Sequence, residues 1–112
     1  MMEAWELADL ERDRAAVGRL YHEFLSVPDL SAGLYVLEAS ATDPQSPHTE
    51  DELYYVVSGR ARITVGEDDR PVGTGSLVFV AAHVAHRFHD IEERLVLLVV
   101  FGPAEGSRAA TT

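Results

Sequence analysis

The stretch SPHTEDELYYVVSG, residues 46–59, is the most informative part of the chain, because a histidine and three consecutive acids come directly before a run of aromatic and β-branched residues. Such a run favours a half-buried strand. Side chains two apart on a strand point the same way, so an extended backbone would place four polar residues on one face: Ser46, His48, Glu50 and Glu52. Burying a lone carboxylate on an interior face is costly, but a divalent cation reverses the sign of that cost.

Short extended segments separated by glycine, proline and acidic clusters follow residue 20, a pattern typical of an all-β sandwich or barrel. We predict seven strands, at residues 21–27, 33–39, 52–58, 60–66, 76–82, 85–91 and 94–101. Tight connections, including a reversal at Ser58-Gly59 and a turn at residues 71–75, predict hairpins and therefore an antiparallel β-barrel. The side chains that we expect to line its interior are Tyr54, Val56, Ile63, Leu77, Phe79 and Phe88.

One short helix is predicted within residues 6–20, with Asp9 as its cap and Gly18 as its stop. A chain of 112 residues has the size of one domain. We divide it into an N-terminal helix or extension at residues 1–19, a barrel core at about 20–103 and a loose tail at 104–112.

Strand 94–101 does not alternate, because LVLLVVF is apolar on both faces. Its second face therefore needs cover from the helix or from another copy of the chain. The sequence predicts a homodimer on this ground.

The composition excludes several classes of protein. A formal net charge of -10, with nine scattered Lys and Arg, argues against a nucleic-acid partner. The sequence shows no basic leader and no apolar run near the roughly 20 residues of a membrane span, so we expect a cytoplasmic protein without membrane contact. Because the chain has no cysteine, any metal must be held by histidine, carboxylate or amide groups.

The spacing of residues 46–59 resembles the first motif of the metal-binding cupins, which are small double-stranded β-helix, or jelly-roll, barrels. His48, Glu52 and Gly59 stand at the positions of the second histidine, the glutamate and the glycine of that motif. Ser46 replaces its first histidine.

A second stretch keeps the register of the second cupin motif. Gly75 and His86 match its first glycine and its histidine, whereas Ala81 and His83 replace proline and glycine, and Asp90 replaces asparagine. The resemblance covers about residues 33–101.

The resemblance implies metal ligands at His48, Glu52 and His86, with the fourth position open to water or filled by another group: Gln45, Ser46 or Glu50. Two imidazoles and one carboxylate suit Fe, Mn, Ni or Zn as divalent ions. Among the other histidines, we expect His83 in an exposed turn, His89 at the surface or rim, and His22 in a structural or interfacial place. Tyr54 or Tyr55 as a general acid is a further hypothesis.

Three functions stay open at this level. The first is a metalloenzyme acting on a small oxygenated or carboxylate-type metabolite by dioxygenase, isomerase or lyase chemistry. The second is a non-catalytic module that binds a metal or small ligand, and the third is a degenerate barrel without metal. Because only neutral imidazoles bind metals, occupancy should fall as the pH drops through about 6.

Overall fold

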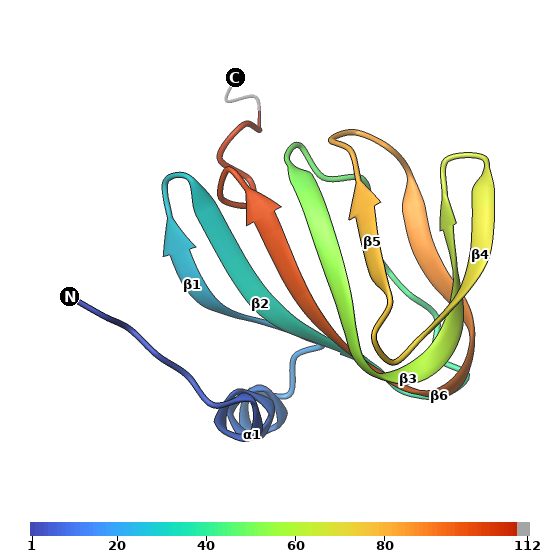
Figure 1. Ribbon diagram of the computed structural model, residues 1–112, viewed down its shortest axis with the longest axis horizontal. Coiled ribbons are helices and arrows are strands. Elements are labelled where there is room, and N and C mark those ends of the chain that lie inside the picture. The colour runs from blue at the N-terminus through green and yellow to red at the C-terminus, as the bar shows by residue number, and fades with distance from the viewer. Residues whose placement is uncertain (110–112) are drawn as a thin grey trace.

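The computed structural model describes residues 1–109 and shows one helix beside a curved antiparallel sheet (Figure 1). The elements in chain order are α1 (Leu7–Val17), β1 (Tyr21–Val27), β2 (Leu30–Leu37), β3 (Asp51–Val65), β4 (Asp68–Gly73), β5 (Leu77–Val80) and β6 (His86–Gly102). The strand order is β1-β2-β6-β3-β4, and β5 pairs with the first half of β3. The predicted all-β class with one short N-terminal helix is confirmed, although the sheet does not close on itself.

Two long strands, β3 and β6, replace four of the shorter strands that the sequence predicts. Their pairing shifts register between Val56 and Arg62, and these bulges bend the two strands together. The predicted reversal at Ser58-Gly59 is therefore wrong, because Gly59 lies at a bend inside one continuous strand. The predicted turn at residues 71–75 is also partly wrong, since β4 continues to Gly73 beside β3.

Gly59 is the residue that makes this bend sterically accessible. Its φ of 106° is unfavourable for side chains with a Cβ, and an added Cβ would lie 2.2 Å from the carbonyl oxygen of Arg94. The backbones of β3 and β6 can approach this closely only because the position carries no side chain.

The concave face of the sheet holds the main hydrophobic core, which is built around Tyr54, Phe88 and Phe101. On β5 the inward side chains are Val78 and Val80. The prediction that Leu77 and Phe79 line the interior is wrong: they are 63% and 61% exposed on the opposite face. The apolar run of β5 does not reveal which of its two faces is buried.

The convex face is covered at one end by α1, whose Leu10 packs with Leu34, Val36 and Val96. The helix itself begins after Glu6 instead of at the predicted cap Asp9, and it ends at Gly18 as predicted. No helix within residues 1–109 has the length and apolar character needed to cross a membrane.

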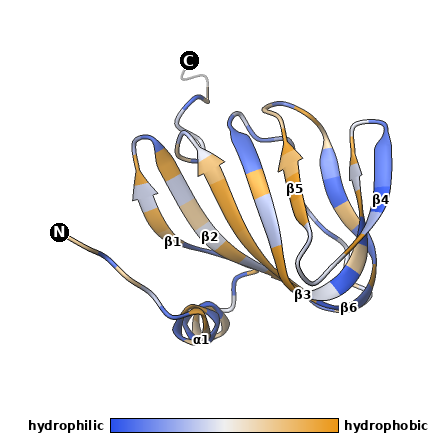
Figure 2. Cartoon of the chain, in the orientation of Figure 1, coloured by the Kyte–Doolittle hydropathy of each residue, from blue (hydrophilic) through white to orange (hydrophobic). Residues whose placement is uncertain are grey.

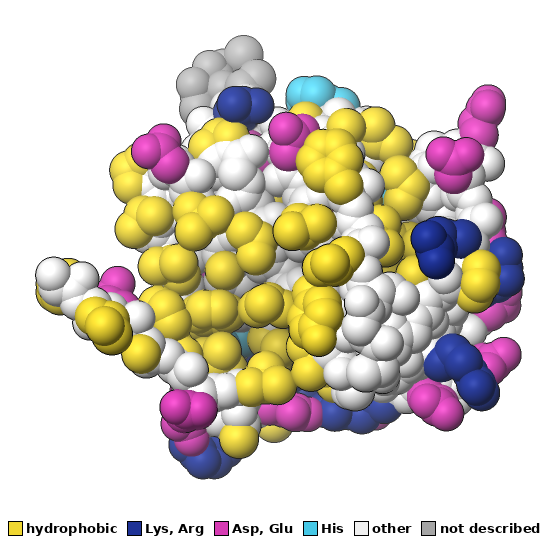
Figure 3. Space-filling model, in the orientation of Figure 1, with side chains coloured by type: hydrophobic (Ala, Val, Ile, Leu, Met, Phe, Trp, Pro, Cys, Tyr) yellow, Lys and Arg dark blue, Asp and Glu magenta, His cyan; other side chains and the backbone are white. Residues whose placement is uncertain are grey.

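The register of β2, β6, β3 and β5 aligns two apolar rows across the convex face, one of which starts at Leu34 beneath the helix. The rows are Ala32, Val100, Leu53 and Phe79, and Leu34, Leu98, Tyr55 and Leu77. Figures 2 and 3 show hydrophobic residues along these strands and across this face, with charged side chains toward its edges. Such a surface is typical of an interaction site.

The bend can be tested by comparing two glycine substitutions. Gly59→Ala should lower the free energy of unfolding by about 2–4 kcal/mol, because it adds a clash to the strained φ. Gly75→Ala is a matched control, since Gly75 also has a positive φ of 94° but no atom near its missing Cβ. It should cost only about 1 kcal/mol. If urea unfolding shows that both substitutions lower the free energy of unfolding by the same amount, the close approach of β3 and β6 at Gly59 is not what requires glycine.

The predicted homodimer can be tested on the same convex face. A second copy of the chain would pack its own apolar rows against these rows, which carry no charged side chain. Light scattering after size exclusion should give about twice the chain mass of 12.3 kDa. Phe79→Asp should shift the protein to the monomer, because pairing would bury the new charge. Val17→Asp adds the same charge to an exposed apolar position on α1 and should leave the mass unchanged.

Candidate metal centre

Three potential metal ligands converge at the concave face. His48 lies in the loop before β3, Glu52 is the second residue of β3, and His86 is the first residue of β6. Glu52 Oε1 is 3.1 Å from His86 Nε2 and 3.7 Å from His48 Nε2, and one ligand atom of each residue lies within 4.8 Å of the others. The side chains of Glu52 and His86 are 1% exposed and that of His48 is 18% exposed.

This convergence depends on the bend of β3 and β6. In the paired strands, Glu52 stands opposite Phe101, whereas His86 stands opposite Val65 at the other end of β3. A straight β3 would separate Glu52 and Val65 by about 43 Å, at roughly 3.3 Å per residue. The ribbon of β3 and β6 therefore folds over to bring its two ends together.

A hydrogen bond outside the cluster orients the His86 imidazole, and the carboxylate of Glu105 faces the imidazole of His48. His86 Nδ1 is 3.0 Å from the carbonyl oxygen of Val84, which fixes the proton on Nδ1 and leaves a lone pair on Nε2. His48 Nδ1 faces Glu105 Oε2 at 3.3 Å, and its own carbonyl accepts a hydrogen bond from the N–H of His83. Both Nε2 atoms are thus directed toward Glu52.

The atoms at the centre of the cluster fit a shared cation. Within the part of the chain that the structure describes, Glu52 Oε1 and His86 Nε2 are buried without a hydrogen-bond partner. Two ligands bound at right angles to one ion at about 2.1 Å stand about 3 Å apart, close to the observed spacing. Burial lowers the pKa of His48, which favours the neutral imidazole that a metal requires. For His86, burial lowers the pKa but contacts with Glu52 and Val84 outweigh it, so a proton competes with a cation there.

Gln45 is the predicted fourth group that the structure brings to the cluster. Its Oε1 lies 3.2 Å from His48 Nε2 and accepts a hydrogen bond of 2.7 Å from the Tyr54 hydroxyl. Its Nε2 donates to Asp43 Oδ2 at 2.7 Å, which fixes the orientation of the amide. Ser46 is exposed in the same loop.

Asp43 is a site residue that sequence reasoning missed. It is 7% exposed and accepts hydrogen bonds from the Tyr35 hydroxyl at 2.5 Å and from the Phe88 N–H at 2.9 Å, besides those from Gln45. It therefore ties the loop that carries Gln45 and His48 to β2 and β6. No motif spacing singles it out, because its partners lie far away in the sequence.

Glu50 binds the C-terminal turn and does not share a strand face with Glu52, contrary to what strand alternation would suggest. Residues 46–50 precede β3, so the predicted common face of Ser46, His48, Glu50 and Glu52 is wrong. Glu50 is 1% exposed and accepts hydrogen bonds from Thr49 and from the N–H groups of Gly106 and Arg108. Burial raises the pKa of Glu50, but these hydrogen bonds outweigh burial and lower it.

The bonds to Glu50 hold a C-terminal turn against the sheet. The Glu105 N–H also donates to Ser31 Oγ at 2.8 Å, and the Ala104 N–H contacts the carbonyl of Pro28 at 3.3 Å. Part of the segment that the sequence predicts as a loose tail thus contacts the sheet through these hydrogen bonds. Residues 110–112 lie outside the described part of the chain. Glu105, brought to the site by this turn, is a second residue that the sequence analysis missed.

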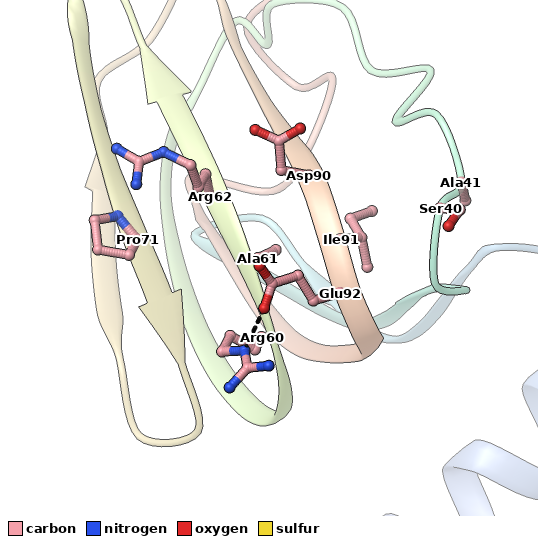
Figure 4. A pocket seen from close by; sticks show the side chains of 9 residues that line it. All are labelled: Ser40, Ala41, Arg60, Ala61, Arg62, Pro71, Asp90, Ile91 and Glu92. Carbon is pink, nitrogen blue, oxygen red and sulfur yellow. Dashed lines mark ion pairs between the residues drawn. The ribbon is translucent and has the colours of Figure 1, made fainter.

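A cavity of about 110 Å³ adjoins the cluster. It is lined by Tyr21, Tyr35, Gln45, His48, Glu52, Val99, Phe101 and Glu105. A larger hollow of about 670 Å³ lies elsewhere on the sheet, where Arg60 pairs with Glu92 at 2.7 Å (Figure 4). The larger hollow contains none of the clustered ligands, whereas a third cavity, of about 240 Å³, is lined by His86 and Gln45. The cavity of about 110 Å³ is the one that adjoins both His48 and Glu52.

The remaining histidines lie outside the cluster. His83 is exposed in a turn, in agreement with the sequence prediction. His89 lies at the rim, where its Nε2 is 2.6 Å from Asp69 Oδ2 and its Nδ1 is 3.1 Å from Asp90 Oδ2. His22 is partly buried in β1.

Comparison with known proteins gives a consistent family. The model of the Cupin domain matches residues 33–101. An uncharacterized protein of Streptomyces coelicolor is 53% identical over 104 residues, which cover 93% of this chain and 99% of the relative.

Solved structures agree with the fold. A Cupin 2 conserved barrel domain protein from Salinispora arenicola superposes with a TM-score of 0.72 at 21% identity, covering 93% of this chain and 91% of the other. An RmlC-like cupin with a double-stranded β-helix fold from Methanocaldococcus jannaschii gives 0.68 at 16% identity, covering 75% and 79%. At these identities the structures support the jelly-roll architecture alone.

The rim cluster around Asp69 predicts a pH dependence of stability. Hydrogen bonds from Thr64, Arg62 and His89 hold the pKa of Asp69 well below its usual range. Its stabilisation is therefore complete above the ordinary Asp pKa of about 3.9 and is lost as the pH falls toward the lower folded value.

Asp69→Asn should consequently be less stable than the wild type at neutral pH, with the difference shrinking in acid. Urea unfolding between about pH 7 and pH 2 measures this, and Asp68→Asn removes the same charge from the preceding position of β4 as a control. A difference that grows in acid would contradict the assignment.

Proposed function

This chain belongs to the cupin domain family, and we propose that it binds one divalent metal ion through His48, Glu52 and His86. The observation that carries the proposal is the burial of Glu52 Oε1 and His86 Nε2, 3.1 Å apart, with no hydrogen-bond partner in the described residues. A cation would compensate both atoms at once. Gln45 Oε1 is the protein group best placed for a fourth position.

The donor set fits the borderline divalent ions Fe, Mn, Ni and Zn, because it joins imidazoles with harder oxygen atoms and lacks thiolate. Such a metal supplies a Lewis acid that polarises an oxygen atom of a bound molecule. The cavity beside the cluster gives that molecule a place in contact with His48 and Glu52. A metal with a position open to substrate is typical of catalytic sites.

We propose on this basis a metalloenzyme for a small oxygenated or carboxylate-type metabolite. Three of the polar residues that line the cavity would bind and orient that molecule: Tyr21, Gln45 and Glu105. Tyr54 holds the Gln45 carbonyl, and burial raises the pKa of its hydroxyl, so its role is positioning. Dioxygenase, isomerase and lyase chemistry all stay within the proposal, as does a cytoplasmic location.

Metal binding is tested by elemental analysis after reconstitution with Fe(II), Mn(II), Ni(II) and Zn(II). The wild type should hold about one equivalent per chain. His86→Ala should lose most of it, because it removes one of three main ligands. His89→Ala removes a histidine from the same strand outside the cluster and should retain the metal. Less than a tenth of an equivalent in the wild type with every ion would sink the proposal.

The supporting role of Asp43 gives a second test. Asp43→Asn should weaken metal binding by about 10- to 100-fold, because the Gln45 loop loses the carboxylate that anchors it. Gln45→Leu should weaken binding as well, and the double variant should add little, since both changes act through one amide. Fully additive losses in competition titrations with a chelator would argue that Asp43 acts by another route.

A further inference from the structure

Tyr21 presents an unused hydrogen-bond donor at the cavity beside the metal cluster. Its hydroxyl oxygen is buried and has no hydrogen-bond partner among residues 1–109, although its ring lines the cavity. Burial, with the neighbouring carboxylate of Glu105, raises the pKa of Tyr21, so the phenol keeps its proton. A buried hydroxyl usually has a partner, and a bound molecule would supply it here.

The sheet holds this phenol in one place. Tyr21 pairs with Tyr35 across β1 and β2, and their rings pack edge to face with centroids 6.2 Å apart. A Cβ at Gly33 would lie 2.3 Å from Tyr21 Cζ, so the missing side chain makes the space that the ring occupies. The packing against Tyr35 and Gly33 therefore fixes the position of the Tyr21 ring at the wall of the cavity.

Glu105 gives the same cavity a second carboxylate. Its Oε2 lies 3.3 Å from His48 Nδ1, and its side chain is 31% exposed. The backbone of its turn is fixed by Ser31 and Glu50. One wall of the cavity thus offers a hydroxyl donor, and another offers a carboxylate acceptor.

The charges at the cavity decide which ligands it favours. A divalent ion with Glu52 alone would leave a charge near +1, which attracts a small carboxylate. Glu105 lines the cavity with Glu52 and brings this sum to about zero, so an anionic ligand would be repelled by a second carboxylate on entry. The volume of about 110 Å³ holds about four water-sized groups, at roughly 30 Å³ each.

We propose that this cavity binds a small uncharged molecule with adjacent carbonyl and hydroxyl oxygens, with Tyr21 donating to one oxygen and Glu105 accepting from the hydroxyl. This inference rests on the proposed metal site and narrows its ligand class. Tyr21 and Glu105 act as specificity-determining residues, and the metal ligands alone would favour the anion.

Hydroxyacetone and glycolate form a matched pair of probes, because they differ only by a methyl group in place of a charged oxygen. Protein loaded with Co(II) should bind hydroxyacetone more tightly than glycolate, as read from the visible spectrum of the metal. Tyr21→Phe should weaken hydroxyacetone binding by about 10-fold, the loss expected for one buried hydrogen bond, with Co(II) stoichiometry unchanged. Glu105→Gln should reverse the preference toward glycolate.

Tyr55→Phe is the matched control, since Tyr55 is 39% exposed on the convex face. It should bind both probes as the wild type does. If Co(II) is not taken up at all, the proposed metal site fails and this inference fails with it. If Co(II) binds stoichiometrically but the wild type prefers glycolate, or Tyr21→Phe binds hydroxyacetone unchanged, the inference alone is overturned.

Discussion

The carboxylate of Glu52 is the constraint around which this molecule is arranged. It is placed in an apolar interior beside two imidazoles, where an isolated negative charge would cost several kcal/mol. The protein itself supplies no hydrogen bond to Glu52 Oε1 within the described chain, although it supplies several to the neighbouring carboxylates of Asp43 and Glu50. Three buried acids thus lie close together in the fold. Hydrogen bonds offset the cost of burying two of them, Asp43 and Glu50. The third, Glu52, depends on positive charge beside it, which a cation held with His48 and His86 would supply.

The paired strands β3 and β6 fold over, and this fold brings the residues around Glu52 together. Because β3 and β6 run beside each other for most of their length, a single bend near Gly59 moves the start of β3 toward the start of β6. The loop with Gln45 and His48 then closes the same end of the sheet, and Asp43 connects it to β6. Packing, backbone pairing and ligand geometry therefore depend on the same few residues.

Sequence periodicity was sufficient for the antiparallel class and for the helix, because alternation and turn residues are local signals. Motif spacing was sufficient to single out His48, Glu52 and His86, which the structure brings together. It did not choose among the alternatives for the fourth position, of which Gln45 lies beside His48. Prediction from the sequence failed where a feature depends on tertiary contacts. A glycine inside a long strand resembles a turn, so β3 and β6 were each divided in two.

The same limit explains the errors at single residues. The buried face of β5 depends on its partner β3, and nothing within LVFV decides between its two sides. In the sequence Glu50 resembles a solvated acid, because its hydrogen bonds with the C-terminal turn are set by tertiary contacts. Tyr21, Asp43 and Glu105 lie at the site but belong to strands and loops that share no sequence motif.

The place of β6 in the sheet also bears on how the protein is made. It is the last strand in the sequence, yet it lies between β2 and β3 and pairs with both. While a ribosome is still extending the chain, the β1–β2 hairpin and β3 have no common neighbour, although domains generally begin to fold from the N-terminus during synthesis. Their assembly into one sheet, and the arrival of His86 and Glu105, must therefore wait until β6 and the turn after it have been synthesised.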